Sequence, residues 1–305
     1  MSLRNFFRQG LTGCIPAFFQ TGKCRKVDSV QFSGRRLISW AAYLGFFLFV
    51  AWHGLIFAAD QQTSAERFLT LWAGTLPIVF SAPHGGREAL PGVAARRGTG
   101  VAQFVTGRDT RTDELAEAIV AKLAQRLGGR PHLVLARFER KYVDVNRPSS
   151  DAYESENAKI YYDGYHSALT EACRRVRAEW GRGLLLDIHG EGSESDAIFR
   201  GTNNGQTVES LTRKFGIEAL NGSRSVVGQL KQKGYKVFPL NGTEKEQRYS
   251  GGFIVRSYGS HTADGIDAMQ LEFGSALRGR ALLERTANDV ADAISVFAQA
   301  YLPVK

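Results

Sequence analysis

The sequence predicts an α/β domain whose sheet is mixed but largely parallel, with helices on both faces. Short apolar runs alternate with amphipathic helical stretches from Gly74 onward, a pattern typical of sheets covered by crossover helices. Two of these runs lead into a histidine, and ligands bind beyond the carboxyl ends of the strands in such sheets. No repeat or Pro-rich linker marks a second domain, so we expect one domain over residues 60–305.

The individual elements follow from the spacing of the apolar residues. Runs of apolar residues predict strands, and apolar residues spaced three or four apart predict helices. We expect strands at 76–81, 132–138, 142–145, 184–186, 236–240, 253–258 and 268–273, of which the second and third are two strands or one bent strand. We expect helices at 112–127, 158–180 and 277–301. Asp109 and Thr110 are available to cap the first helix.

The first 59 residues differ from the rest in charge and hydropathy. Seven cations and one anion there carry +6 of the net charge of +9, which leaves +3 for the remainder. That remainder gives no strong reason to bind polyanions, so we expect no nucleic-acid partner. Residues 37–59 contain no Asp, Glu, Lys or Arg. A helix of that length spans roughly 34 Å, enough to cross a hydrocarbon core of about 30 Å.

These features predict a basic cytoplasmic leader at 1–36 and a transmembrane anchor or uncleaved signal at 37–59. All the leader's cations precede the apolar stretch, so the positive-inside rule places the α/β domain outside the cytoplasm, in the periplasm if the source is bacterial. Residues 57–59 hold only half of a small-x-small cleavage pattern. A retained membrane anchor is therefore preferred, with an exported soluble form as the alternative.

Two histidines at strand ends are candidate zinc ligands. His84 lies between Pro83 and two glycines. Asp187 and His189 point to the same face of their strand because side chains alternate, so the carboxylate can orient the imidazole. A catalytic zinc ion takes three protein ligands from His, Asp or Glu and leaves one position open. The two histidines therefore predict a Zn²⁺ site that needs one further ligand.

The third ligand has three candidates. Glu88 follows His84 by four residues in the same loop and is preferred, whereas Asp109 and Asp113 begin the next helix. Each also has a structural interpretation, as a solvated loop carboxylate, a helix cap or a partner of the helix dipole.

Glu272 is the candidate catalytic carboxylate. It lies in a strand of alternating residues, so it shares one face with Gln270 while apolar residues take the other. A buried glutamate is costly unless it is paired or functional. Beside a zinc site it could take a proton from water and pass it to a leaving nitrogen. The alternative is an edge strand with Glu272 in solvent.

Arg140, Asn146 and Arg147 gather cations and an amide near a strand end. Arginine binds carboxylates in two-point fashion, which suits a substrate with a free acid group. The alternative for Arg147 is a structural ion pair. The run is too short and too poor in aromatic residues for a nucleic-acid patch.

Taken in order, these motifs resemble the N-formylglutamate amidohydrolase family. The matching segments are Ser81-Ala82-Pro83-His84-Gly85-Gly86, Asp109-Thr110 with Asp113-Glu114-Leu115, Val143-Asp144-Val145-Asn146-Arg147, Asp187-Ile188-His189 and Gln270-Leu271-Glu272. The resemblance covers nearly all of the chain from residue 76. It implies the phosphorylase/hydrolase-like α/β fold of the zinc carboxypeptidase and aspartoacylase group.

The resemblance also implies roles for residues. His84 and His189 match zinc ligands, Glu272 matches the general base, and Asn146 and Arg147 match a segment that binds a substrate carboxylate. Carboxypeptidases have a glutamate three residues after the first histidine, where this chain has Arg87 and the glutamate comes one residue later.

The implied activity is zinc-dependent hydrolysis of the amide bond in a small acidic N-acyl amino acid such as N-formylglutamate. Because the domain is predicted to face outward, a second activity is the alternative: carboxypeptidase-like hydrolysis of peptides, cell-wall peptides or poly-γ-glutamate. The alternative from another class is a non-catalytic module that binds carboxylates.

Overall fold

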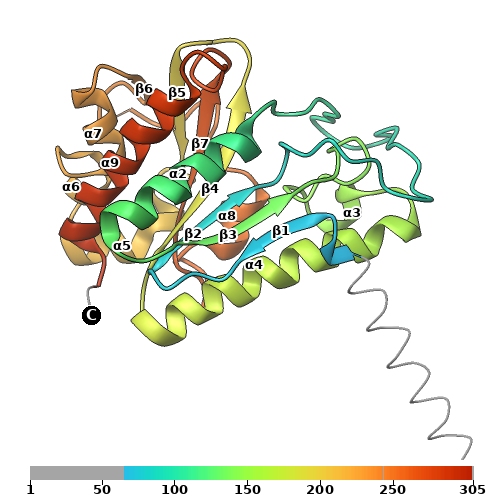
Figure 1. Ribbon diagram of the computed structural model, residues 1–305, viewed down its shortest axis with the longest axis horizontal. Helices are drawn as coiled ribbons and strands as arrows, with labels where there is room; N and C mark the ends of the chain where they lie inside the picture. The colour runs from blue at the N-terminus through green and yellow to red at the C-terminus, as the bar shows by residue number, and fades with distance from the viewer. Residues whose placement is uncertain (1–64, 243, 304–305) are drawn as a thin grey trace, which may run out of the picture. The chain divides into compact units, whose positions relative to one another are not determined.

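A mixed sheet of seven strands forms the centre of the computed structural model, which describes residues 65–242 and 244–303 (Figure 1). The strand order is β1-β3-β2-β4-β7-β5-β6. The strands are β1 (Leu69–Trp72), β2 (Ile78–Ala82), β3 (His132–Ala136), β4 (Leu184–Glu191), β5 (Ala197–Gly201), β6 (Lys236–Phe238) and β7 (Asp267–Gly274). β3, β2, β4 and β7 run parallel, and β1 and β5 pair antiparallel with β3 and β7. The predicted mixed, largely parallel sheet is confirmed.

Helices cover both faces of this sheet, as predicted (Figure 1). α2 (Thr112–Leu127) and α9 (Leu283–Tyr301) pack on one face, and α4 (Lys159–Trp180) and α8 (Phe253–Tyr258) on the other. The alternation of strand side chains produces the two cores, because Phe80 packs under α2 and α9 while its neighbour Val79 packs under α4. Strands buried on both faces need continuous apolar runs. This requirement explains the runs seen in the sequence.

Shorter elements complete the described part of the chain. α7 packs against α9, and α5 contacts α6 and β7. These elements are α3 (Ser149–Ala152), α5 (Glu209–Phe215), α6 (Glu218–Asn221), α7 (Val226–Gln232), and the 3₁₀ helices η1 (Glu156–Ala158) and η2 (Gln206–Val208).

Two predicted strands are wrong. Residues 253–258 form the helix α8, because Asn146 Oδ1 accepts a hydrogen bond of 2.8 Å from the Ile254 N–H and thereby caps the helix from a distant part of the chain. Residues 142–145 form turns, because the N–H groups of Tyr142 and Asp144 donate to the carbonyls of Glu139 and Ala152 instead of to a strand. β1 and β5 were not predicted.

The predicted cap of α2 is also wrong. The N-cap is Arg111, in a left-handed conformation with φ of 61°, and its side chain makes no cap hydrogen bond. Asp109 contributes only its carbonyl oxygen, which accepts from the N–H and hydroxyl of Thr112. The carboxylate of Asp109 is therefore available elsewhere.

The predicted leader at 1–36 and membrane segment at 37–59 lie outside the described residues. Within the residues that the structure describes, none of the helices combines the length and apolarity needed to span a bilayer. The described residues all belong to one compact unit.

Candidate metal centre and active site

Three parallel strands bring the predicted histidines and Glu272 to one end of the sheet. β2 ends at Ala82, two residues before His84, while His189 lies within β4 and Glu272 within β7. β4 and β7 are neighbours, and their register places His189 directly opposite Glu272. Paired residues on adjacent parallel strands point to the same face. The convergence expected from the sequence is therefore confirmed for these side chains.

His84, Asp109 and His189 form a buried group whose ligand atoms all lie within 4.8 Å of one another. The Nδ1 atoms of both histidines lie 3.4 Å from the same oxygen, Asp109 Oδ2. The two imidazole rings are 4.9 Å apart between centroids and nearly perpendicular, at 75°. Two imidazole nitrogens and one carboxylate oxygen are a donor set typical of catalytic zinc sites.

A second carboxylate holds the far nitrogen of each histidine. His84 Nε2 lies 2.8 Å from Asp144 Oδ1, and His189 Nε2 lies 2.7 Å from Asp187 Oδ2. A proton on Nε2 that is donated to a carboxylate leaves the lone pair of Nδ1 directed at the centre. Asp187 was predicted in this role, and Asp144 is its counterpart on the other side.

One nitrogen of His84 indicates whether a metal ion could bind to this group. His84 Nδ1 is buried and has no hydrogen-bond partner among the described residues. A buried polar atom without a partner is costly unless a ligand or ion satisfies it. The donor set and this unsatisfied atom together fit a divalent cation such as zinc.

Asp109 is held by the backbone of Gly190 and by both histidines. Its Oδ2 accepts a hydrogen bond of 3.1 Å from the Gly190 N–H. Although burial acts in the opposite direction, the nearby imidazoles of His189 and His84 hold the pKa of Asp109 well below its ordinary value. Burial likewise opposes the charged form of His189, but Asp187 and Asp109 raise the pKa of His189 well above its ordinary value. Asp109 and His189 therefore each favour the charged form of the other.

The preference for Glu88 as third ligand is corrected. Glu88 is exposed, and its backbone bridges to the segment after β3, with its N–H donating to the Arg137 carbonyl and its carbonyl accepting from the Glu139 N–H. This pairing fixes the backbone of Glu88 against that segment, and its carboxylate is not among the clustered ligand atoms. Asp113, the other alternative, forms an ion pair with Arg137 at 3.1 Å.

Glu272 is buried in the middle of the sheet, so the alternative of an exposed edge strand is excluded. Its Oε1 accepts a hydrogen bond of 2.7 Å from Gln270 Nε2. Burial raises the pKa of Glu272 to about 7, with His189 opposing and Asp109 adding to the shift. A carboxyl group that titrates near neutrality can both accept and donate a proton.

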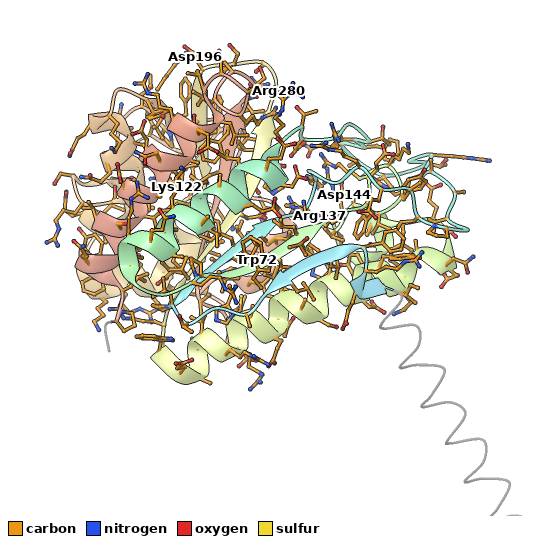
Figure 2. The ribbon with its side chains drawn as sticks, viewed as in Figure 1. Trp72, Lys122, Arg137, Asp144, Asp196 and Arg280 are labelled. Carbon is orange, nitrogen blue, oxygen red and sulfur yellow. The ribbon has the colours of Figure 1, made fainter. Side chains whose placement is uncertain are left out.

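Asp144 is fully buried and lies at the loop-rich end of the sheet (Figure 2). Three arginines surround its carboxylate. Asp144 Oδ2 lies 2.9 Å from Arg140 Nε, 3.8 Å from Arg147 Nε and 3.8 Å from Arg96 Nη2. His84 shares the same carboxylate. Asp144 and Asp109 are two carboxylates against three guanidinium groups, so this side of the site keeps an excess of positive charge.

Of the predicted substrate-binding residues, Arg140 and Arg147 belong to this cluster, and Asn146 and Arg140 reach toward the centre. Asn146 Nδ2 lies 3.4 Å from His189 Nε2, and Arg140 Nη1 lies 3.9 Å from Asp109 Oδ1. Arg147 is partly exposed and donates 2.9 Å to the Gln103 carbonyl. Sequence analysis missed Arg96, a buried arginine in a segment without regular structure. No local pattern marks such a residue.

The sequence is similar to one known protein family and to two named relatives. The model of the family described as N-formylglutamate amidohydrolase matches residues 76–159 and 155–277. The N-formylglutamate deformylase of Pseudomonas aeruginosa is 27% identical over 247 residues, which are 68% of this chain and 84% of that protein. The enzyme of the same name from Pseudomonas putida is 26% identical over 251 residues, 69% of this chain and 85% of that protein.

Two solved structures share the fold. The N-formylglutamate amidohydrolase of Ralstonia eutropha has a TM-score of 0.55 and 20% identity, covering 76% of this chain and 98% of that chain. A gene product of Agrobacterium tumefaciens has a TM-score of 0.51 and 15% identity, covering 78% and 95%. The family match spans more than half of the sequence, and the predicted resemblance is confirmed: the chain belongs to the N-formylglutamate amidohydrolase family, whose members are hydrolases of carbon–nitrogen bonds.

Proposed function

We propose that the chain hydrolyses the amide bond of an acidic N-acyl amino acid, such as N-formylglutamate, in a zinc-dependent reaction. The observation that carries the proposal is the convergence of two imidazole Nδ1 atoms on Asp109 Oδ2, with buried Glu272 opposite His189. The two Pseudomonas relatives named N-formylglutamate deformylase support the choice of substrate.

His84, His189 and Asp109 would hold the zinc ion. A bound zinc ion would act as a Lewis acid toward the amide carbonyl and lower the pKa of the attacking water. Asp144 and Asp187 keep the two imidazoles in the tautomer that offers Nδ1 to the centre. The ring orientations are thereby set before any ligand binds.

Glu272 would move the proton. Its carboxylate accepts the proton that the attacking water loses and returns it to the amide nitrogen as that nitrogen leaves. The raised pKa of about 7 makes both transfers feasible near neutral pH. Gln270 holds one carboxylate oxygen through a hydrogen bond and leaves the other for this transfer.

Arg140, Asn146 and Arg147 would orient the substrate through its free carboxylate. The excess positive charge around Asp144 attracts an acid, and the partly exposed Arg147 can meet it from solvent. An acidic substrate anchored there would place its amide bond beside the histidines, because Asn146 contacts His189. Holding the reacting bond in this way lowers the entropic cost of reaction.

The test combines metal analysis with a substrate panel on the purified full-length protein. We expect one zinc ion per chain, and cleavage of N-formylglutamate in preference to its α-carboxamide and to γ-linked glutamyl peptides. Asp109→Asn should lose the zinc ion, whereas Glu88→Gln, the matched control on the exposed carboxylate, should retain it. Absence of stoichiometric zinc, or zinc without cleavage of any N-acyl acidic amino acid, would contradict the proposal.

A further inference from the structure

Arg278 is a buried arginine in the segment between β7 and α9. Its Nε donates 3.0 Å to the Phe273 carbonyl, and its Nη2 donates 3.0 Å to the Glu191 carbonyl. Its Nη1 donates 2.7 Å to the Thr110 hydroxyl and also to the Thr110 carbonyl. One guanidinium therefore joins three segments that are far apart in the sequence.

Each acceptor lies close in sequence to a residue of the candidate centre. Thr110 follows Asp109, Phe273 follows Glu272, and Glu191 lies two residues after His189. His189 and Glu272 are already aligned by the ladder between β4 and β7. Asp109 lies in a segment without regular structure that passes through the left-handed Arg111. The bonds to Thr110 therefore hold the segment of Asp109, a member of the group that lies outside the sheet.

Gly190 provides a second, independent observation. A Cβ atom at this position would lie 2.7 Å from Arg278 Cζ and 2.8 Å from Nε, closer than real Cβ atoms come to other heavy atoms. The guanidinium thus lies directly against the backbone of Gly190, whose N–H donates to Asp109 Oδ2. Any side chain at residue 190 would displace Arg278.

The charge of Arg278 is not used in an ordinary ion pair. Among the described residues, its hydrogen bonds go to carbonyl and hydroxyl oxygens and to no carboxylate. A buried charge without a partner is expensive. Burial lowers the pKa of Arg278, and the carboxylates of Asp109, Glu272 and Glu191 oppose this shift.

We propose that Arg278 is a positioning residue of this centre, which holds Asp109 at the correct distance from His189 and Glu272 and requires glycine at residue 190. This role rests on the proposed function, because it assumes that Asp109 is a zinc ligand. Groups that orient metal ligands typically contribute ten- to hundredfold in metal affinity. Arg278 would act in this way through the backbone rather than by touching the ion or the substrate.

The experiment measures zinc affinity of the full-length protein by competition with a chromophoric chelator, and the fold by circular dichroism and thermal unfolding. The variants are Arg278→Lys, which keeps the charge but loses the planar fork, and Gly190→Ala, which keeps Arg278 but displaces it. Arg126→Lys is the matched control, because Arg126 also donates from three nitrogens and joins α2 to α9 near the opposite end of α2 from Asp109.

We expect Arg278→Lys and Gly190→Ala each to weaken zinc binding by about tenfold or more. The fold-loss of zinc affinity in the double variant should be smaller than the product of the two single fold-losses, because both substitutions disrupt the same interaction. Arg126→Lys should lower the melting temperature while changing zinc affinity by less than about twofold, as expected for a distant site.

Wild-type zinc affinity in folded Arg278→Lys would overturn the positioning role and leave the proposed function intact. Should Arg278→Lys fail to fold, Gly190→Ala decides, and unchanged affinity there overturns the role equally. A wild-type protein that binds no zinc would instead refute the proposed function, and the role of Arg278 with it.

Discussion

The candidate site has two halves that are built in different ways. In the strand half, Asp187 and His189 on β4 face Gln270 and Glu272 on β7, and a continuous parallel ladder sets their register. In the loop half, His84, Asp109 and Asp144 lie outside the strands and helices. Backbone hydrogen bonds therefore order the strand half, while side-chain contacts order the loop half.

This difference predicts where the site is fragile. Asp144 accepts from Arg140, from the Asn146 N–H and from His84, so removing its charge releases three groups at once. Asp187 holds His189 and the Ser81 hydroxyl, whose own strands are already paired. Loss of one carboxylate should therefore disturb the loop half more than the strand half, where strand pairing holds the same residues in place.

The largest expected effect lies in the strand half, where Glu272→Gln removes the proposed proton acceptor and leaves the ladder intact. We expect kcat to fall by at least about a hundredfold, the usual contribution of a positioned acid–base group, with zinc content unchanged. Steady-state hydrolysis of N-formylglutamate provides the measurement. Glu209→Gln, on the exposed surface of α5, is the control. Activity of Glu272→Gln near that of the control would exclude Glu272 as the base.

The same substitution should stabilise the metal-free protein at high pH. Burial raises the pKa of Glu272 from 4.5 to about 7, so the folded state binds this proton more tightly than the unfolded state. Stability is therefore lost as pH rises from about 4.5 to about 7, with a cost of about 3 kcal/mol above that range. Urea unfolding with a chelator present should show Glu272→Gln more stable than wild type at pH 8 but not at pH 4. An equal difference at both pH values would contradict this account.

A direct comparison of the halves comes from Asp144→Asn and Asp187→Asn. Both variants weaken the acceptor for a histidine Nε2, and such changes usually cost ten- to hundredfold in metal affinity. We expect the loss of metal affinity to be larger for Asp144→Asn, because this change also weakens the hydrogen bonds from Arg140 and from the Asn146 N–H. Chelator competition measures both affinities. Equal losses would show that the ladder gives His189 no additional support.

The sequence predicted the strand half better than the loop half. The reason is again that strand pairing orders the first half and side-chain contacts order the second. Apolar runs predicted β2, β4 and β7, and alternation placed Glu272 on the face of Gln270. These are properties of a single strand. The histidines were identified because each follows or ends such a run.

The loop half depends on contacts that no local pattern contains. Glu88 was preferred over Asp109 because it is nearer to His84 in sequence, yet the bridge of Glu88 to Phe138 leaves it outside the group. The helix α8 was mistaken for a strand because its apolar run contains two β-branched residues, and its cap comes from Asn146, 108 residues away. Tertiary contacts overrode closeness in sequence in the first case and local strand propensity in the second.

The position of β7 has a consequence for how the protein is made. β7 follows the other six strands in the described sequence, yet it lies between β4 and β5 in the sheet. A chain emerging from the ribosome therefore presents both histidines and Asp109 before the strand that carries Glu272 has been synthesised. Until β7 inserts, β5 cannot join the rest of the sheet, and the site lacks Glu272 and the ladder that aligns it with His189.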